Sequence, residues 1–209
     1  MKKALDLLLV NPGNRLEQYA KLNELATIGP PLGIAMLAAY VRQYGFSVVI
    51  IDAEAFFWTP EQTIEEIEKY EPVLVGLTTF TTKMTAAGKT LKLVKDRMPF
   101  VKTMIGGHHA SAIPERTLRD EAADFVIQGE GYLPVVELLK KLKDKRDDFD
   151  VPGICYKKNN LVVSNGRAKG ITRLDELPLA AWDILRILSK KHGKRSFIEA
   201  QTLMDTQFC

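Results

Sequence analysis

Four short groups of glycine, hydroxyl-bearing and polar residues are the parts of this chain best suited to bind a ligand. Each group directly follows a hydrophobic run: they are Asn11-Pro12-Gly13, Thr78-Thr79-Phe80-Thr81, Gly106-Gly107-His108-His109 and Gly129-Glu130-Gly131. Glycines have no Cβ, so a bulky ligand can lie against their backbone, and hydroxyl groups both donate to and accept from amides. The four groups therefore predict a ligand-binding site if the fold brings them together.

The familiar nucleotide-binding glycine patterns do not occur at the expected places. The first hydrophobic run is not followed by G-x-G-x-x-G, and the chain contains neither G-x-x-x-x-G-K-[ST] nor the G-x-S-x-G nucleophile elbow. Asp52 ends the second run, where a dinucleotide-binding fold places the acid that contacts ribose. Without the glycine pattern we interpret Asp52 as structural or loosely ligand-facing.

The titratable residues in these groups have alternative interpretations. His108 and His109 are as consistent with a functional role as with capping, and a zinc site is not predicted because the remaining histidine, His192, lies in a distant basic segment. Glu130 is placed to act as an acid, but capping of the following helix or a hydrogen bond to a ligand fits better. Ser111 or its neighbour is predicted to cap the next helix.

Five hydrophobic runs recur at helix-sized intervals and predict the elements that position these groups. The runs are 7–10, 47–51, 73–77, 102–105 and 124–127, and helical patterns cover 31–44, 60–70, 84–98 and 133–142. None of the runs alternates cleanly between apolar and polar residues, which indicates strands covered on both faces. The sequence thus predicts an α/β fold with a five-stranded parallel, doubly wound sheet of flavodoxin-like order 2-1-3-4-5. In such a sheet the four groups meet at the carboxyl edge.

Two segments depart from this regular pattern. About 20 residues separate the first strand from its helix (11–30), where about 2–6 are usual, so we expect a lid or a ligand contact there. After Lys143 a charged break leads into a predicted β-hairpin around Asn159-Asn160 and then an extended linker, with one helix-like piece at 182–188. We therefore divide the chain into a domain at 1–143 and a hairpin and linker at 144–209.

Composition and charge exclude several classes of protein. The 209 residues are 46% hydrophobic and 26% charged, as in ordinary globular domains, and the net charge is +3. Five of the positive charges lie between Arg186 and Arg195, which leaves 24 Lys and Arg against 26 Asp and Glu elsewhere. This distribution argues against a nucleic-acid partner, and we interpret the basic segment as a solvated linker.

Cysteine content and the apolar segments set the expected compartment. Two cysteines, Cys155 and Cys209, cannot form a disulfide framework or a four-cysteine metal site. Lys2-Lys3 precede a run that Asp6 interrupts, which is not typical of a signal peptide. The longest apolar stretch, 28–41, is too short and too rich in Pro and Gly to cross a membrane. We expect a cytoplasmic protein that has no membrane partner.

A set of short motifs in a fixed order carries a resemblance to a known family. The motifs are Asn11-Pro12, Pro30 to Ile34, Val75 to Thr78, Gly106 to Glu115, Asp124 to Gly131, Pro152 to Ile154, Leu174 to Pro178 and Ala181 to Asp183. Together they resemble the cobalamin-binding domain that precedes the radical S-adenosylmethionine domain in B12-dependent radical enzymes. Each motif alone is weakly specific, but the ordered set covers roughly residues 5 to 209.

The resemblance implies how cobalamin would be bound. The corrin ring would lie across the strand carboxyl ends, with the nucleotide tail inserted beside the sheet. Thr78 and Gly106-Gly107 resemble the serine-x-leucine and glycine-glycine tail-binding elements, and His109 would contact the tail or a corrin amide without binding cobalt. Residues 11–15 contain no histidine, so the Asp-x-His-x-x-Gly element that supplies a lower axial ligand is missing.

The resemblance also limits what this chain should do alone. The parent enzymes hold a [4Fe–4S] cluster through C-x-x-x-C-x-x-C, and aligning Cys209 with its end places Thr202 and Thr206 at the first two positions. Threonine cannot replace a thiolate, so Cys209 would be a lone remnant of the cluster motif. The cluster and S-adenosylmethionine are therefore expected only in a full-length parent, whose radical SAM domain lies in cis or on a partner chain.

The sequence leaves two other functions open. One is a small flavodoxin-like hydrolase or transferase that uses Glu130 and His109. The other is a regulatory domain that binds a flavin or a nucleotide. A bulky residue in place of Gly107 is expected to weaken cobalamin binding by intruding on the ligand surface while leaving the fold intact.

Overall fold

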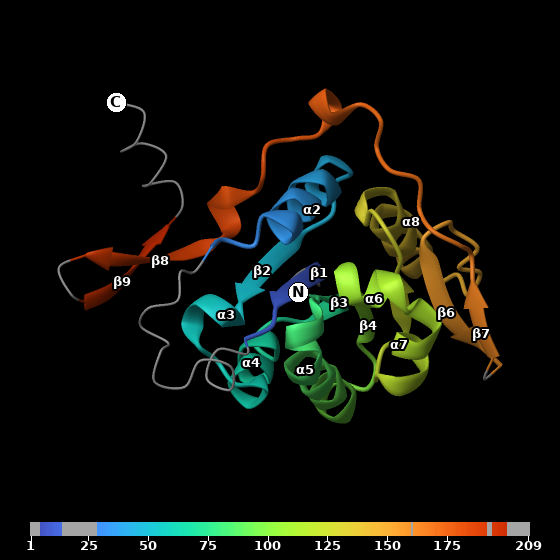
Figure 1. Cartoon of the computed structure of the whole chain (residues 1–209), viewed down its shortest axis with the longest axis horizontal. Coiled ribbons are helices and arrows are strands. Elements are labelled where there is room, and N and C mark those ends of the chain that lie inside the picture. Colours follow the sequence, from blue (N-terminus) through green and yellow to red (C-terminus); the bar gives the residue numbers. More distant parts are fainter. Residues whose placement is uncertain (1–4, 14–28, 160, 192–193, 200–209) are drawn as a thin grey trace.

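A computed structural model of the chain describes residues 5–13, 29–159, 161–191 and 194–199, with side chains up to residue 185. Seven strands form one sheet in the order β2-β1-β3-β4-β5-β6-β7 (Figure 1). The strands are β1 Leu5–Asn11, β2 Val48–Asp52, β3 Pro72–Thr78, β4 Lys102–Gly106, β5 Phe125–Ile127, β6 Ile154–Lys158 and β7 Leu161–Ser164. The first five are parallel, so the predicted order 2-1-3-4-5 is confirmed.

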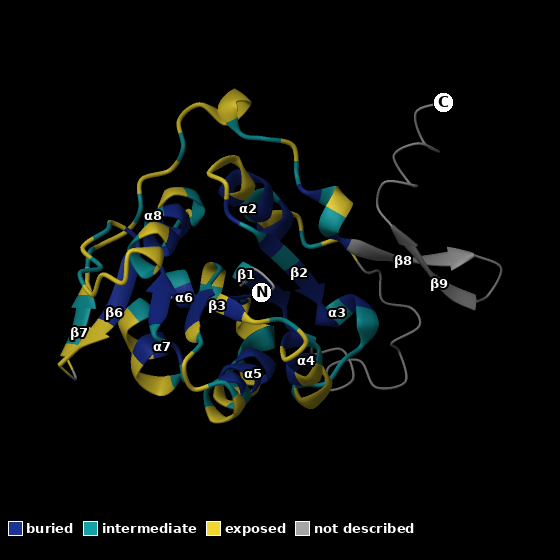
Figure 2. Cartoon of the chain, turned by 180° about the vertical axis from the view of Figure 1, so that it is seen from behind, coloured by how far each residue is buried: buried dark blue, intermediate teal, exposed yellow. Residues whose placement is uncertain are grey.

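Helices cover both faces of this sheet, as a parallel sheet requires. The helices are α2 Leu32–Gln43, α3 Ala53–Phe56, α4 Pro60–Ile67, α5 Met84–Arg97, α6 His108–Ala112, α7 Pro114–Asp120 and α8 Tyr132–Lys143. One hydrophobic core lies between the sheet and α2 with α8, and a second lies between the sheet and α4, α5 and α7. Figure 2 shows the buried strands between these helices.

Strand residues alternate between the two cores. In β1, Leu7 and Leu9 belong to the core beneath α2 and α8, whereas Leu8 and Val10 belong to the opposite core. Both faces are therefore buried, which explains why the hydrophobic runs show no polar alternation.

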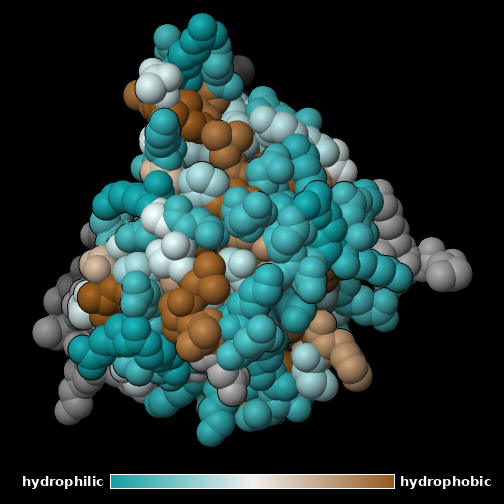
Figure 3. Space-filling model, turned by 90° about the vertical axis from the view of Figure 1, so that its right-hand side faces the viewer, coloured by the Kyte–Doolittle hydropathy of each residue, from teal (hydrophilic) through white to brown (hydrophobic). Residues whose placement is uncertain are grey.

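The C-terminal hairpin corrects the predicted number of strands. β6 pairs antiparallel with β5, and β7 pairs antiparallel with β6, so the hairpin continues the sheet to seven strands instead of lying beyond a sheet of five. Viewed from the side on which β6 and β7 lie, the surface is largely hydrophilic with small separate hydrophobic groups (Figure 3).

The basic segment also differs from the prediction. Its backbone forms strand β8 at Arg186–Lys191, which pairs antiparallel with β9 at Lys194–Glu199, so it is a hairpin and not an irregular linker. The helix-like piece is a single 3-10 turn, Trp182–Ile184, followed directly by β8. Asn160, His192, Thr202, Thr206, Cys209 and residues 14–28 of the long connection lie outside the described residues.

The segment before β8 crosses the outside of α2 (Figure 1). The amide of Ala181 donates to the carbonyl of Ala35 at 3.0 Å, and Arg42 pairs with Asp183 at 2.7 Å. Leu185 is buried against the α2 core. This segment therefore fixes the position of α2. Within the described part of the chain, no helix is long and apolar enough to cross a membrane.

Candidate functional site

A cavity of about 780 Å³ opens at the carboxyl edge of the sheet, between the strand ends and helices α2 and α8. Its volume is in the range of small-molecule and cofactor sites, about 300–1,000 Å³. Nine of the residues predicted for the site line it: Asn11, Thr78, Phe80, Gly106, Gly107, His108, Gly129, Glu130 and Gly131. The topology thus brings all four sequence groups to one cavity.

Five predicted residues are close by but do not line the cavity in the described structure: Pro12, Gly13, Thr79, Thr81 and His109. Two of them, Gly13 and Thr79, contact neighbouring backbone at the strand ends. A Cβ on Gly13 would lie 2.7 Å from the carbonyl oxygen of Trp58, so this glycine lets the strand end pass close to the chain after α3. The Thr79 hydroxyl is buried and donates to the carbonyl of Gly106 at 3.1 Å.

The two adjacent glycines after β4 have different roles. Gly107 has φ +97°, and a Cβ there would lie 2.6 Å from the backbone oxygen of Thr79, so the fold itself requires glycine. A Cβ on Gly106 would meet only atoms of Ile127, at 3.5 Å or more, which is ordinary contact. Among the described atoms nothing therefore excludes a Cβ at Gly106, and this residue lines the cavity. The expectation that a bulky residue at Gly107 leaves the fold intact is therefore wrong.

The two adjacent histidines point to different places. His108 lines the cavity, and its ring stacks on Phe80 with centroids 5.0 Å apart and planes 13° apart. The Nδ1 atom of His109 instead lies 3.1 Å from the hydroxyl of Thr81. The sequence singled out His109 for ligand contact, whereas the structure gives His108 the position at the cavity.

Lys83 is a charged lining residue that the sequence analysis missed. Its ammonium donates to Oδ1 of Asn11 at 2.9 Å and lies 3.8 Å from the carboxylate of Glu54. Asn11 in turn donates to Asp52 at 2.7 Å. Residue type and position did not single out Lys83, because a lysine directly after Thr81-Thr82 is as typical of an exposed helix start as of a ligand-binding site.

Asp52 supports this network and does not line the cavity. It caps α3 by accepting from the amide of Ala55 at 3.2 Å. Burial raises the pKa of its carboxyl, and the hydrogen bonds from Asn11 and Ala55 and the charge of Lys83 partly offset that rise. The structural interpretation of Asp52 is confirmed.

Ser111 and Glu130 do not cap helices as predicted. The hydroxyl oxygen of Ser111 lies inside α6 and accepts from the amide of Gly129 at 3.0 Å, so it ties the ends of β4 and β5 together. Helices α7 and α8 begin with no cap from a described side chain, and Glu130 lies exposed at the cavity. Of its predicted roles, capping is wrong, and a hydrogen bond to a ligand stays a prediction.

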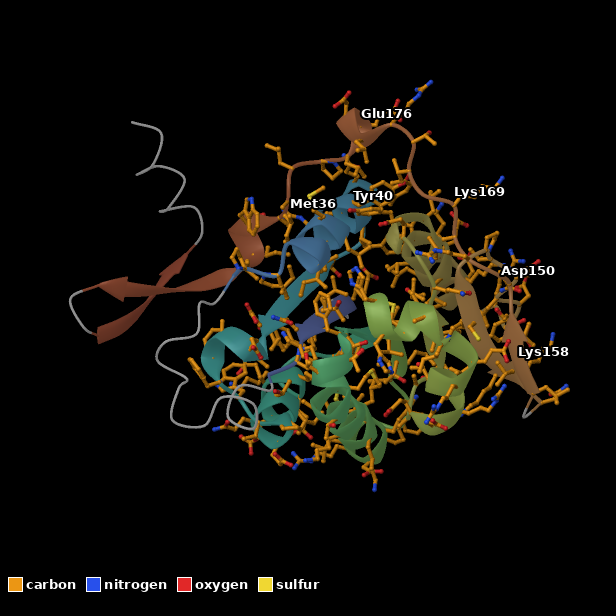
Figure 4. The ribbon with its side chains drawn as sticks, in the orientation of Figure 1. Met36, Tyr40, Asp150, Lys158, Lys169 and Glu176 are labelled. Carbon is orange, nitrogen blue, oxygen red and sulfur yellow. The ribbon has the colours of Figure 1, made fainter. Side chains whose placement is uncertain are left out.

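Aromatic packing holds the two helical walls of the cavity together. The ring of Tyr40 on α2 (labelled in Figure 4) lies 5.2 Å from the ring of Tyr132 on α8, which lines the cavity. Burial and a hydrogen bond with Tyr44 raise the pKa of Tyr40 to about 12.

Comparisons with known proteins identify the family of this chain. The sequence profile of the family described as "B12 binding domain" matches residues 21–139, more than half of the chain. This chain belongs to that family. An uncharacterized methyltransferase of Pyrococcus horikoshii is 34% identical over 88% of this chain, and the cobalamin-dependent radical SAM methyltransferase TokK of Streptomyces tokunonensis is 28% identical over 77%.

Solved structures support the fold of this B12-binding domain. OxsB, a cobalamin-dependent S-adenosylmethionine radical enzyme solved with aqua-cobalamin and S-adenosylmethionine, superposes with TM-score 0.70 and 22% identity over 87% of this chain. TsrM of Kitasatospora setae, a radical S-adenosylmethionine methyltransferase solved with cobalamin and a [4Fe-4S] cluster, gives 0.63 and 19% over 95%. The predicted resemblance and the Rossmann-like, flavodoxin-like class are confirmed, and cobalamin is the ligand of the family.

The B12-binding domain is one part of these relatives. The chain spans 39% of the length of the Pyrococcus relative, 24% of TokK and 25% of OxsB. Within the described residues no group of three His, Cys, Asp or Glu side chains is arranged to hold a metal ion.

Proposed function

We propose that the carboxyl-edge cavity holds cobalamin, with the corrin ring at its mouth and the nucleotide tail between the sheet and α2 with α8. We further propose that the domain serves a radical SAM domain, in cis or on a partner chain, in methyl transfer or a radical rearrangement. Bound cobalamin supplies a cobalt centre that carries the methyl group or assists the rearrangement.

The main support for the proposal is that residue 106, at the cavity, is a glycine. The fold would accept a Cβ there without a clash, yet the residue is glycine and it lines the cavity. Gly129 also lines the cavity at the next strand end, and a Cβ there would lie 2.9 Å from the side chain of Arg167, another lining residue. A large planar ligand needs such a surface, because each added Cβ would hold it away from the backbone amides.

Polar side chains around this surface are placed to orient the corrin amides and the tail. Thr78 lines the cavity, so its hydroxyl is placed to form a hydrogen bond with a ligand. Lys83 is held by Asn11 and presents a positive charge at the strand ends. The stacked rings of His108 and Phe80 offer a flat, half-apolar surface to the corrin face.

The alternative of a small hydrolase has weaker geometric support. Glu130 lines the cavity, but His109, its supposed partner, pairs with Thr81 and does not line the cavity in the described structure. An acid–base pair needs both groups within reach of one substrate.

Titration of the 209-residue chain with hydroxocobalamin tests the proposal. We expect saturable binding at micromolar concentrations with a base-off spectrum, since the tail leaves cobalt to enter the protein. Parallel titrations with FMN and AMP test the flavin and nucleotide alternatives, and we expect neither to bind. An unchanged cobalamin spectrum at several hundred micromolar protein would contradict the proposal.

A further inference from the structure

The inner part of the cavity is a slot with apolar walls. The slot is defined by six lining residues: Leu9, Ile34, Leu37, Gly76, Met104 and Val135. Leu9, Gly76 and Met104 are register partners on adjacent strands β1, β3 and β4, so they form a continuous floor. Helix α2 contributes one wall through Ile34 and Leu37, and helix α8 contributes the other.

Gly76 sets the depth of this slot. A Cβ at this position would lie 2.4 Å from the terminal methyl of Met104 and 3.1 Å from a methyl of Leu9. The Met104 side chain therefore lies flat over the glycine, in space that any other residue would occupy. A glycine inside a central strand weakens the sheet and often marks a close approach. At position 76, the absence of a side chain leaves the slot deep enough for a flat group.

The polar lining begins one row further toward the strand ends. Thr78 pairs with Gly106 in that row, and Tyr132 is the first residue of α8, at the same edge. A group that reaches the slot floor thus loses water and meets hydrocarbon and a thioether. Methionine packs well against aromatic rings.

Resting on the proposed function, we propose that the slot selects corrinoids by their lower base and favours a benzimidazole over an adenine. A benzimidazole is largely hydrocarbon, whereas adenine carries an amino group and further ring nitrogens. Each polar group that is buried without a partner weakens binding, and polar mismatches of this kind change affinity by about tenfold or more. Met104 and Gly76 are the residues that impose the discrimination.

Equilibrium dialysis of the full 209-residue chain against three corrinoids tests this inference. The probes are hydroxocobalamin, its adenine-based analogue pseudocobalamin, and cobinamide, which has no nucleotide tail. We expect cobalamin to bind about tenfold or more tightly than pseudocobalamin, and more tightly than cobinamide. Equal affinity for cobalamin and pseudocobalamin overturns the inference, as does equal affinity for cobalamin and cobinamide. Failure of all three to bind would instead contradict the proposed function.

Gly76→Ala tests the floor itself. The added methyl should push the flexible end of Met104 into the slot, so cobalamin should bind about tenfold more weakly while cobinamide binding is unchanged. Gly170→Ala is the matched control, because a Cβ there meets nothing within 4 Å. Unchanged cobalamin affinity in Gly76→Ala overturns the assignment.

Val135→Thr keeps the test decisive if Gly76→Ala does not fold. It preserves side-chain volume and adds one hydroxyl to the buried α8 wall. The preference for cobalamin over pseudocobalamin should shrink severalfold, and an unchanged ratio overturns the inference.

Discussion

At the carboxyl edge the two faces of the sheet carry different kinds of side chain, although the same strands form both faces. On the face covered by α4, α5 and α7, the last strand positions are large and fully buried, as in Val10, Ile105 and Val126. On the face covered by α2 and α8, the neighbouring positions are small or polar, as in Thr78 and Gly106. Alternate side chains of one strand therefore build a closed core and an open site.

This difference shows how the fold keeps its strands rigid and still leaves space for a large ligand. The closed face fixes the strands through packing, so the open face can omit side chains without losing its shape. The helices of the open face are held elsewhere. Tyr40 and Tyr132 join α2 to α8, and Asp183 holds α2 through Arg42.

Ile105→Ala should produce the largest effect, and it should be an effect on stability. Removing a fully buried side chain of the closed face costs about 2–5 kcal/mol in free energy of unfolding, measured by urea titration. Folded Ile105→Ala should bind cobalamin nearly as well as wild type. A clear loss of affinity in the folded variant would break the distinction between the faces.

Gly107→Ala should also destabilise, by about 1–3 kcal/mol or more. Its φ of +97° disfavours any side chain, and a Cβ would collide with the Thr79 backbone. Thermal unfolding measures this cost. Wild-type stability in this variant would show that the β4–α6 turn is not constrained as described.

Gly106→Val, on the open face, should weaken cobalamin binding and leave the stability of the fold nearly unchanged. The added Cβ meets only Ile127, at 3.5 Å or more, and Gly106 lines the cavity, so stability should stay within about 1 kcal/mol of wild type. Affinity for hydroxocobalamin should fall by about thirtyfold, or about 2 kcal/mol. If binding is unaffected, the ligand surface lies elsewhere.

The smallest effect concerns Asp52, which supports Asn11 of the open face. Because burial raises its pKa, the folded state holds the proton more tightly than the unfolded state does. The contribution of Asp52 to stability should therefore fall as pH rises from about 4 through its folded-state pKa. The free energy of unfolding of wild type minus that of Asp52→Asn should be smaller at pH 7 than at pH 4. A difference that grows with pH would contradict this sign.

The sequence predicts the sheet well, because hydrophobic runs and helical periodicity reflect local burial. The order of the five parallel strands, the four longer helices α2, α4, α5 and α8, and nine lining residues follow from that pattern and from residue type. The pairing of the hairpin with β5 could not be predicted, because antiparallel pairing between distant segments leaves no local pattern in the sequence. The charged break after Lys143 leads into β6, which pairs with β5, and the division of the chain at this point stays a prediction.

Other features depend on three-dimensional detail that residue type does not encode. The sequence cannot tell that His108 and not His109 lines the cavity, since that depends on the turn at Gly107. Arg167 reaches the cavity because the amide of Ala168 donates to the carbonyl of Gln128, a contact between distant segments. Gly76 is the residue from which the floor of the slot could have been predicted, because a glycine inside a buried strand indicates a close approach.

A crystal structure of this chain with hydroxocobalamin would show directly whether the cavity binds cobalamin. We expect density for the nucleotide tail between the sheet and α2 with α8, reaching Gly76 and Met104, and for the corrin ring above Gly106 and His108. Cobalamin bound on another surface, with this cavity empty, would contradict this expectation.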